Sequence, residues 1–217
     1  LGLFTATTIL YSSYVNTGST SNSYYAAIIA LIGVFVGYFY TAKPIRLSSR
    51  YGLGELSIFL SFGPLLTLGT GFAITSDTIL LYSNEFYNLL ILGIPIGLLT
   101  TNILFINQYP DYTSDKKVGK NHLVVILGKK ASRWIYAINT AVVIGSLYFI
   151  SENILNDTQG LLFLYILIPV SMIYSYYLIS GLFKYYNSRE LIKYNIHTIY
   201  FHMFFSFIYM IILANFQ

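Results

Sequence analysis

Charge is the scarcest property of this 217-residue sequence, because only 9% of its residues are Asp, Glu, Lys or Arg. Soluble domains carry roughly 25% charged residues. A chain with so few charges cannot cover a water-exposed surface, and 56% of its residues are hydrophobic. Cysteine is absent, which excludes disulfide bonds and thiol catalysis. The composition indicates an integral membrane protein in contact with the lipid bilayer, and we expect no nucleic-acid partner.

Six hydrophobic runs approach the length of about 20 residues that a helix needs to cross a bilayer. They lie at about 24–40, 55–74, 86–107, 133–150, 160–183 and 194–214. A seventh apolar stretch, from Leu1 to about Tyr11, is too short to cross alone. We predict an all-α fold: a polytopic transmembrane helical bundle of six full spans and part of a seventh, forming a single domain over residues 1–217.

The loops between these runs alternate in charge. All twelve Lys and Arg residues fall in the second, fourth and sixth loops. The first loop, which includes Asn16, is uncharged, while the third and fifth contain acids such as Asp77 and Asp157. Alternate loops lie on one side of a membrane, and Lys and Arg mark the cytoplasmic side. We therefore predict that the three basic loops are cytoplasmic.

The fourth loop also contains acids, in "NQYPDYTSDKKVGKNHLVVILG". Asn107, Asp111 and Asp115 follow one another at intervals of four, so on a helix each lies only about 40° from the last. Pro110 also allows a kink or the start of a new helix beyond the membrane. Their carboxylate and amide oxygens suit Mg²⁺, which takes one or two carboxylates and completes its shell with water and phosphate. We predict a magnesium site here.

The alternative is a solvated pair of aspartates whose charge is balanced by neighbouring lysines. Lys116, Lys117 and Lys120 are close enough in sequence to provide that balance. For His122, which follows them, we expect solvation within the loop.

The second loop, "YTAKPIRLSSRYGLGEL", gathers cations beside a tyrosine. Pro44 predicts the end of the preceding helix. Lys43, Arg46 and Arg50, next to the Tyr40 hydroxyl, form a suitable site for a phosphate-rich group. The alternative is that these cations only set topology and extend toward lipid headgroups.

The second and fourth loops are complementary. One offers cations and the other offers oxygen ligands, and both are predicted to lie on the same side of the membrane. Gly52 and Gly54 favour a tight turn into the next helix, where Glu55 lies near the helix N-terminus. A diphosphate bridged through Mg²⁺ would use both loops, and a long apolar chain attached to it would be stabilised within the bilayer.

Both loop sequences resemble conserved blocks of the UbiA superfamily of intramembrane prenyltransferases. "DYTSDKKVGKNHLVVILG" is most similar to its menaquinone-pathway branch, the dihydroxynaphthoate polyprenyltransferases. The resemblance implies nine spans around a central cavity and two Asp-rich motifs that bind prenyl diphosphate through Mg²⁺. Asp111 and Asp115 match the second motif, and Tyr40, Lys43 and Arg46 match the basic block. The candidate site comprises the catalytic residues Asp111 and Asp115, the metal ligands Asp111, Asp115 and Asn107, and the diphosphate-binding residues Tyr40, Lys43, Arg46, Arg50, Lys116 and Lys120.

The implied reaction transfers a polyprenyl group from a prenyl diphosphate to an aromatic acceptor, dihydroxynaphthoate, by Mg²⁺-assisted ionisation and electrophilic aromatic substitution. The family's first Asp-rich motif has no match here. We therefore expect the chain to lack the two N-terminal spans and to be inactive alone. The alternatives are a transporter or channel, or a prenyltransferase with another acceptor: hydroxybenzoate, haem, chlorophyllide or a glycerol phosphate lipid.

Overall fold

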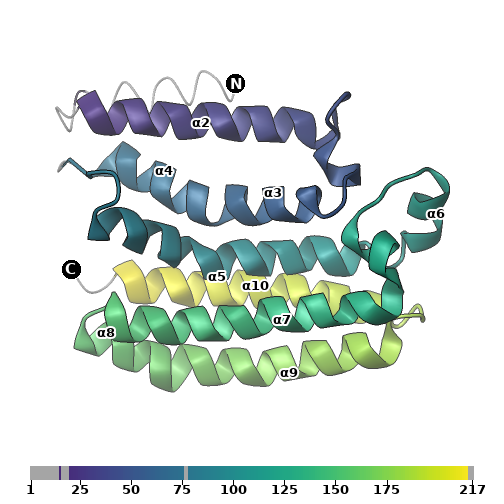
Figure 1. Cartoon of the computed structure of the whole chain (residues 1–217). Helices are drawn as coiled ribbons and strands as arrows, with labels where there is room; N and C mark the ends of the chain where they lie inside the picture. Colours follow the sequence, from purple (N-terminus) through teal and green to yellow (C-terminus); the bar gives the residue numbers. More distant parts are fainter. Residues whose placement is uncertain (1–14, 16–19, 76–77, 215–217) are drawn as a thin grey trace.

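The computed structural model describes residues 15, 20–75 and 78–214, which form helices joined by short loops (Figure 1). The predicted partial span from Leu1 to Tyr11, and the loop residues Asn16 and Asp77, lie outside these described residues. The elements are α2 (Thr20–Thr41), the 3-10 turn η1 (Leu47–Ser49), α3 (Leu53–Phe62), α4 (Pro64–Ile74), α5 (Asn84–Asn107), α6 (Tyr112–Lys117), α7 (Leu123–Asn153), α8 (Asp157–Leu162), the π-helical segment η2 (Phe163–Leu167), α9 (Ile168–Tyr185) and α10 (Leu191–Ala214).

Six helical segments within the described residues are long and apolar enough to cross a membrane. They are Ser21–Thr41, Leu53–Ile74, Asn84–Asn107, Leu123–Asn153, Asp157–Tyr185 and Leu191–Ala214. This confirms the prediction of an all-α, polytopic helical bundle with six full spans.

The predicted start of the fourth span is wrong by ten residues. Helix α7 begins at Leu123 rather than at residue 133, with a non-helical residue at Gly128 (φ 77°). The charges of Lys129, Lys130 and Arg133 made this segment resemble a loop. In the structure, Arg133 Nη1 donates to the Phe183 carbonyl oxygen of α9 at 2.9 Å, so its charge is accommodated at the end of the bundle.

Helix α5 is central. It packs against α3 and α4 on one side and against α7 and α10 on the other (Figure 1). The main core lies among α5, α7, α9 and α10, and a smaller core lies where α2 meets α4 and α5. Polar side chains also link the spans: Asn139 Nδ2 donates to Asn102 Oδ1 at 3.0 Å, and Asn102 Nδ2 donates to Thr140 Oγ1 at 3.1 Å. Such bonds satisfy amides that the bilayer interior leaves without water.

The second span is broken between α3 and α4 at Gly63, and this break lies against α5. A Cβ atom built on Gly97 of α5 would lie 2.5 Å from the Phe59 carbonyl oxygen. Only glycine allows two backbones to approach so closely. The contact fixes α3, and the loop that precedes it, relative to α5 and the loop that follows it.

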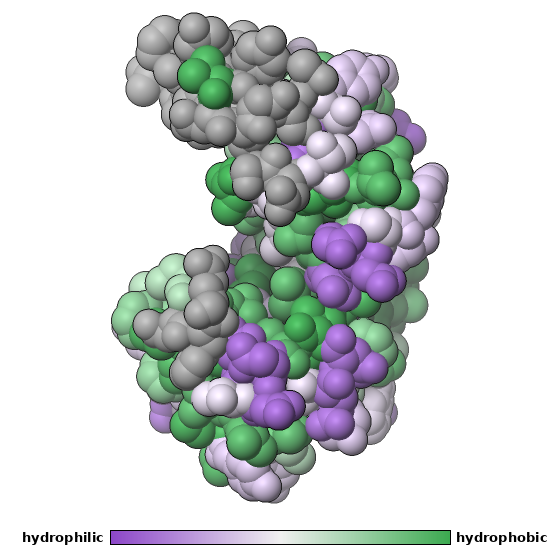
Figure 2. Space-filling view, turned by 90° about the vertical axis from the view of Figure 1, so that its left-hand side faces the viewer, coloured by the Kyte–Doolittle hydropathy of each residue, from purple (hydrophilic) through white to green (hydrophobic). Residues whose placement is uncertain are grey.

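The basic loops gather at one end of the bundle. The segments after α2, from α5 to α7, and between α9 and α10 all lie at the right of Figure 1, and these segments and the adjoining helix ends carry every Lys and Arg of the chain. Figure 2 shows the opposite end, where the described helices form an arc that is open on the left of the view. The basic loop and the acidic loop predicted from sequence therefore lie at the same end of the bundle.

Candidate functional site

The second loop folds back on itself after α2 ends at Thr41. The Arg50 guanidinium donates to the carbonyl oxygens of Pro44, at 2.7 Å, and of Ile45. Arg50 therefore uses some of its guanidinium N–H groups to hold the loop in its folded conformation. Arg46 has a positive φ of 49°, a conformation that non-glycine residues adopt at a cost. Gly52, with φ 86°, makes the turn into α3 that the sequence predicts.

The acidic segment forms a separate helical turn. Helix α5 ends at Asn107, and Asp111 is the N-cap of α6, so a new helix follows Pro110. The Asp115 amide donates to the Asp111 carbonyl oxygen at 2.8 Å, which keeps the two aspartates on one turn. Asn107 does not share their helix. The prediction that all three residues lie on one helical face is therefore wrong. The Asn107 Oδ1 atom accepts from Asn195 Nδ2 of α10 at 3.0 Å.

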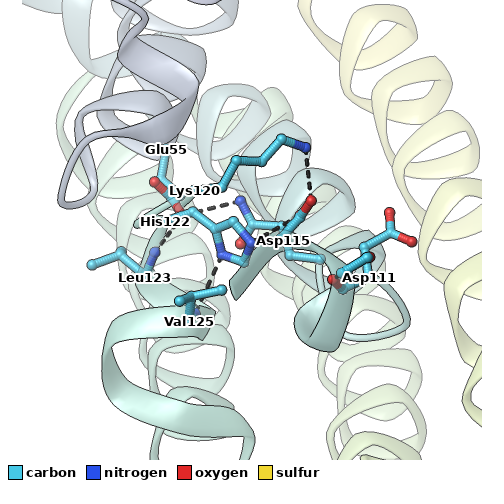
Figure 3. A network of polar contacts seen from close by, with 9 residues as sticks. Glu55, Asp111, Asp115, Lys120, His122, Leu123 and Val125 are labelled. Carbon is cyan, nitrogen blue, oxygen red and sulfur yellow. Dashed lines mark hydrogen bonds and ion pairs between the residues drawn. The ribbon is translucent and has the colours of Figure 1, made fainter. Parts of the chain in front are cut away.

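Asp115 is buried and paired (Figure 3). Its Oδ1 atom lies 2.8 Å from Lys120 Nζ, and its Oδ2 atom lies 3.1 Å from His122 Nε2. Burial alone raises the pKa of Asp115, but its hydrogen bonds with Lys120 and His122 and the charge of Lys120 outweigh burial and lower that pKa below 3.8. The carboxylate is therefore ionised at neutral pH. The ion pair with Lys120 agrees with the alternative given above, in which neighbouring lysines balance the charge of the aspartates.

The expectation that His122 is solvated is wrong. His122 is only 2% exposed and is the N-cap of α7. Its Nδ1 atom accepts from the Val125 amide at 3.4 Å. Because Nδ1 accepts a hydrogen bond, the ring proton is on Nε2, which donates to Asp115. The turn at Gly119 (φ 72°) brings His122 back to Asp115, and helical periodicity does not reveal this contact.

The two loops are joined directly. The Tyr51 amide donates to the Asn121 carbonyl oxygen at 2.7 Å, and the Asn121 amide donates to the Ser49 carbonyl oxygen at 3.2 Å. The sequence placed Glu55 in the first turn of α3, where it lies, but gave no sign of its partners. These partners make Glu55 a second connection between the loops.

Glu55 is 4% exposed, and its Oε1 atom accepts two hydrogen bonds from the far loop. The donors are the Leu123 amide at 3.0 Å and Gln108 Nε2 at 3.1 Å. Figure 3 shows this carboxylate beside the Asp115–His122 pair. Glu55 thus ties the start of α3 to the end of α5 and the start of α7.

A pocket of about 480 Å³ lies between the joined loops. Three of the predicted diphosphate-binding residues line it, together with residues of both loops: Lys43, Pro44, Arg46, Ser49, Arg50, Tyr51, Gly119 and Asn121. The pocket therefore combines the basic loop with the backbone that follows the acidic turn.

The other candidate residues do not line this pocket. Tyr40 lines a mostly apolar pocket of about 340 Å³ between α2 and α3. The Lys116 ammonium lies 5.8 Å from the centre of the Tyr112 ring, and Lys120 is paired with Asp115. The structure brings together Lys43, Arg46 and Arg50, and it joins Lys120 to the acidic turn.

The donor set is compatible with Mg²⁺. The Asp111 carboxylate is exposed, and within the described residues it takes part in no hydrogen bond or ion pair. Asp115 keeps further lone pairs beside its two contacts. No group of three or more His, Asp or Glu side chains in the described part of the chain is arranged to hold a metal. A magnesium ion here would therefore use one or two carboxylates and take its other oxygens from water and phosphate.

Together, the fold and the site define a polytopic helical membrane protein with a pocket lined by basic residues beside an acidic turn. The chain belongs to the UbiA prenyltransferase family, whose model matches residues 2–210, and this confirms the resemblance found in the sequence. No solved structure matches it significantly.

Three curated relatives are similar to part of the chain. It is 31% identical over 122 residues to 1,4-dihydroxy-2-naphthoate octaprenyltransferase of Bacillus subtilis, covering 56% of this chain and 37% of that protein. It is 32% identical over 127 residues to 2-carboxy-1,4-naphthoquinone phytyltransferase of Synechocystis, covering 57% and 37%. It is 37% identical over 87 residues to 1,4-dihydroxy-2-naphthoate octaprenyltransferase of Escherichia coli, covering 40% and 26%. The aligned segments thus span little more than a third of these relatives at most.

Proposed function

We propose that this chain carries the diphosphate-binding end of an enzyme that transfers a prenyl group from a prenyl diphosphate to an aromatic acceptor. The direct connection between the basic loop and the acidic turn carries the proposal. The backbone bonds of Asn121 and the buried Glu55 carboxylate hold cations and carboxylates at one end of the bundle. Family membership favours this reading over a transporter or channel.

The basic residues bind and orient the leaving group. Lys43 and Arg46 line the pocket and donate to diphosphate oxygens, whose negative charge grows as the bond to the allylic carbon breaks. Donors fixed in position stabilise this charge without reorganisation. Asp111 and Asp115 would hold Mg²⁺, which would supply further charge neutralisation to the diphosphate. The electron-rich acceptor ring then attacks the allylic cation and loses a proton.

The proposed acceptor is a dihydroxynaphthoate or a closely related bicyclic aromatic. Two of the relatives are named for 1,4-dihydroxy-2-naphthoate and a third for 2-carboxy-1,4-naphthoquinone, and all three names describe a carboxylated naphthalene ring. Product analysis of the full-length gene product with dihydroxynaphthoate and with hydroxybenzoate distinguishes this class from a monocyclic acceptor. Preferential prenylation of hydroxybenzoate would contradict the proposed acceptor.

The metal role is tested by isosteric substitution of the aspartates. In membranes containing the full-length gene product, Asp111→Asn and Asp115→Asn should lower Mg²⁺-dependent transfer by about 100-fold or more, since each removes a charged ligand. Asp157→Asn, in the first turn of α8 at the opposite end, is the matched control and should have little effect. Near-normal rates of both site variants at limiting Mg²⁺ would exclude the metal assignment.

The basic pocket is tested in the same assay. Arg46→Ala should weaken diphosphate binding and lower the rate at limiting prenyl diphosphate, because the pocket loses one of its charged donors. Lys193→Ala, in the first turn of α10 and outside the lining of the pocket, is the control. Equal losses in the two variants would indicate a general charge effect rather than a diphosphate site.

The site is proposed to face the cytoplasm, because all Lys and Arg residues lie at its end of the bundle. The chain has no native cysteine, so single cysteines introduced into it can be labelled without background from this segment. Cysteines replacing Lys43, Lys120 or Arg189 should resist an impermeant thiol reagent added to intact cells. A cysteine replacing Asn156 should react. The opposite labelling pattern would place the site on the outer face.

A further inference from the structure

We propose that His122 is a positioning residue that orients the Asp115 carboxylate for cation binding. This inference rests on the proposed metal role of Asp115. It assigns to His122 a task in the site that the sequence pattern did not indicate. The imidazole acts through Asp115 and does not itself contact substrate.

Both nitrogens of His122 are used, and each has one clear partner. Nδ1 accepts from the Val125 amide at 3.4 Å, which docks the ring onto the first turn of α7. Nε2 therefore carries the proton and donates to Asp115 Oδ2 at 3.1 Å (Figure 3). The ring is thus fixed by one helix and fixes a carboxylate on another.

Lys120 holds the second oxygen of Asp115 in a different way. Its ammonium lies 2.8 Å from Oδ1, but its side chain is 37% exposed, whereas the His122 side chain is 3% exposed. A long, partly exposed lysine changes rotamer readily, so it can release Oδ1 to an arriving cation and turn toward a phosphate. His122 is enclosed and keeps Oδ2 in place. The two contacts therefore define a fixed oxygen and an exchangeable one.

The start of α7 holds His122 firmly. The Leu123 amide donates to the buried Glu55 carboxylate, and the Asn121 amide donates to the Ser49 carbonyl oxygen, so both chain neighbours of His122 are tied to the basic loop. A carboxylate held in one orientation loses less conformational entropy when it binds a cation. Removal of such outer partners typically costs 10- to 100-fold in metal affinity or activity.

Two substitutions separate this role from simple helix capping. His122→Asn places an amide oxygen near the position of Nδ1, and Asn is a favoured N-cap residue, but its side chain is too short to reach Asp115. His122→Gln extends an amide nitrogen toward the position of Nε2 and can still donate to Asp115, but it is a poorer cap. Capping alone thus favours the Asn variant, while positioning of Asp115 favours the Gln variant.

The experiment titrates Mn²⁺ into the purified full-length gene product in the presence of inorganic pyrophosphate and follows free Mn²⁺ by electron paramagnetic resonance. We expect His122→Asn to raise the half-saturating Mn²⁺ concentration by about 10- to 100-fold, and His122→Gln to restore most of the affinity. The Mg²⁺ half-saturation of prenyl transfer should shift in parallel, with a much smaller change in kcat at saturating Mg²⁺. Thermal unfolding of both variants checks that they fold.

Three results would overturn the inference: unchanged Mn²⁺ affinity in both variants, weaker binding in the Gln variant than in the Asn variant, or no saturable Mn²⁺ binding by the wild type. The binding measurement is independent of the reaction. Mn²⁺ affinity that depends on His122, in a protein that transfers no prenyl group, would refute the proposed function and leave the positioning role intact. Normal prenyl transfer combined with Mn²⁺ affinity that does not depend on His122 would refute the positioning role and leave the proposed function intact.

Discussion

Truncation of Glu55 should loosen the connection between the two loops of the site. In Glu55→Ala, the Leu123 amide and Gln108 Nε2 both lose the oxygen that accepts their hydrogen bonds. The surroundings are buried, since Glu55 itself is only 4% exposed, so water does not simply replace the carboxylate. The substitution therefore tests whether this single side chain holds the basic loop against the acidic turn.

The magnitude follows from the groups left without partners. A buried donor that loses its acceptor costs about 1–3 kcal/mol, and two are affected here. The Glu55 Oε2 atom is buried and has no partner within the described residues, so its removal offsets part of that cost. Loss of a negative charge from the first turn of α3 adds about 0.3–1 kcal/mol. We expect a net loss of about 2–4 kcal/mol in the free energy of unfolding.

Denaturant unfolding in mixed micelles, followed by tryptophan fluorescence, measures this loss. Trp134 of α7 is the only tryptophan in the chain and follows Leu123 in the same helix. Glu55→Gln is the control, because its amide oxygen still accepts a hydrogen bond while the charge is lost, and it should cost less than about 1 kcal/mol. Hydrogen exchange around Leu123 should quicken in the Ala variant. A loss below about 0.5 kcal/mol, or equal losses in both variants, would refute the reasoning.

Three further predictions concern backbone and charge. Gly97→Ala should destabilise the protein by about 1–3 kcal/mol, because the added Cβ would lie 2.5 Å from a backbone oxygen of α3. Gly145→Ala, whose Cβ would meet nothing within 4 Å, should cost nothing in the same titration, and equal effects would refute the packing argument. Arg46→Gly and Arg46→Ala should weaken pyrophosphate binding equally, but the Gly variant should be more stable by about 1 kcal/mol, because φ at this position is 49°. Although burial raises the pKa of Asp115, the contacts with Lys120 and His122 lower it below 3.8, so the stability that these contacts give is complete above that pH and is lost as pH falls through the folded-state pKa. Thermal unfolding of wild type and Asp115→Asn should differ at pH 7 and converge in strong acid, and a difference that persists at the lowest pH would contradict this.

Hydropathy predicted the spans well, because each span must form its backbone hydrogen bonds internally and present apolar side chains to lipid. It failed at the start of α7 because charged residues there lie within a helix. Lys129 and Lys130 belong to turns at the end of the bundle, and Arg133 is held by a carbonyl oxygen of α9. A charge count cannot distinguish a loop from a helix end whose charges find partners.

The site was predicted as two loops, but not as one connected structure. Helical periodicity relates residues four apart, so it identified Asp111 and Asp115 as a pair. It does not relate Asp115 to His122 or Glu55 to Leu123, because those contacts depend on how turns and separate helices meet. Asp111 is exposed and Asp115 is buried, although both are aspartates on the same helical turn. This difference follows from tertiary packing, which the sequence pattern does not show.

Concentration of all lysines and arginines at one end of the bundle also gives the molecule an electrical polarity. Glu85, Glu152 and Asp157 lie toward the other end, so the molecule is a dipole aligned with the helices. In an energised membrane, each net elementary charge gains about 2.3 kcal/mol per 100 mV on the favoured side. With the basic end in the cytoplasm, as proposed above, the voltage that the cell maintains opposes inversion of the inserted protein. For the same reason, a potential imposed during reconstitution into vesicles should align the molecules in one direction.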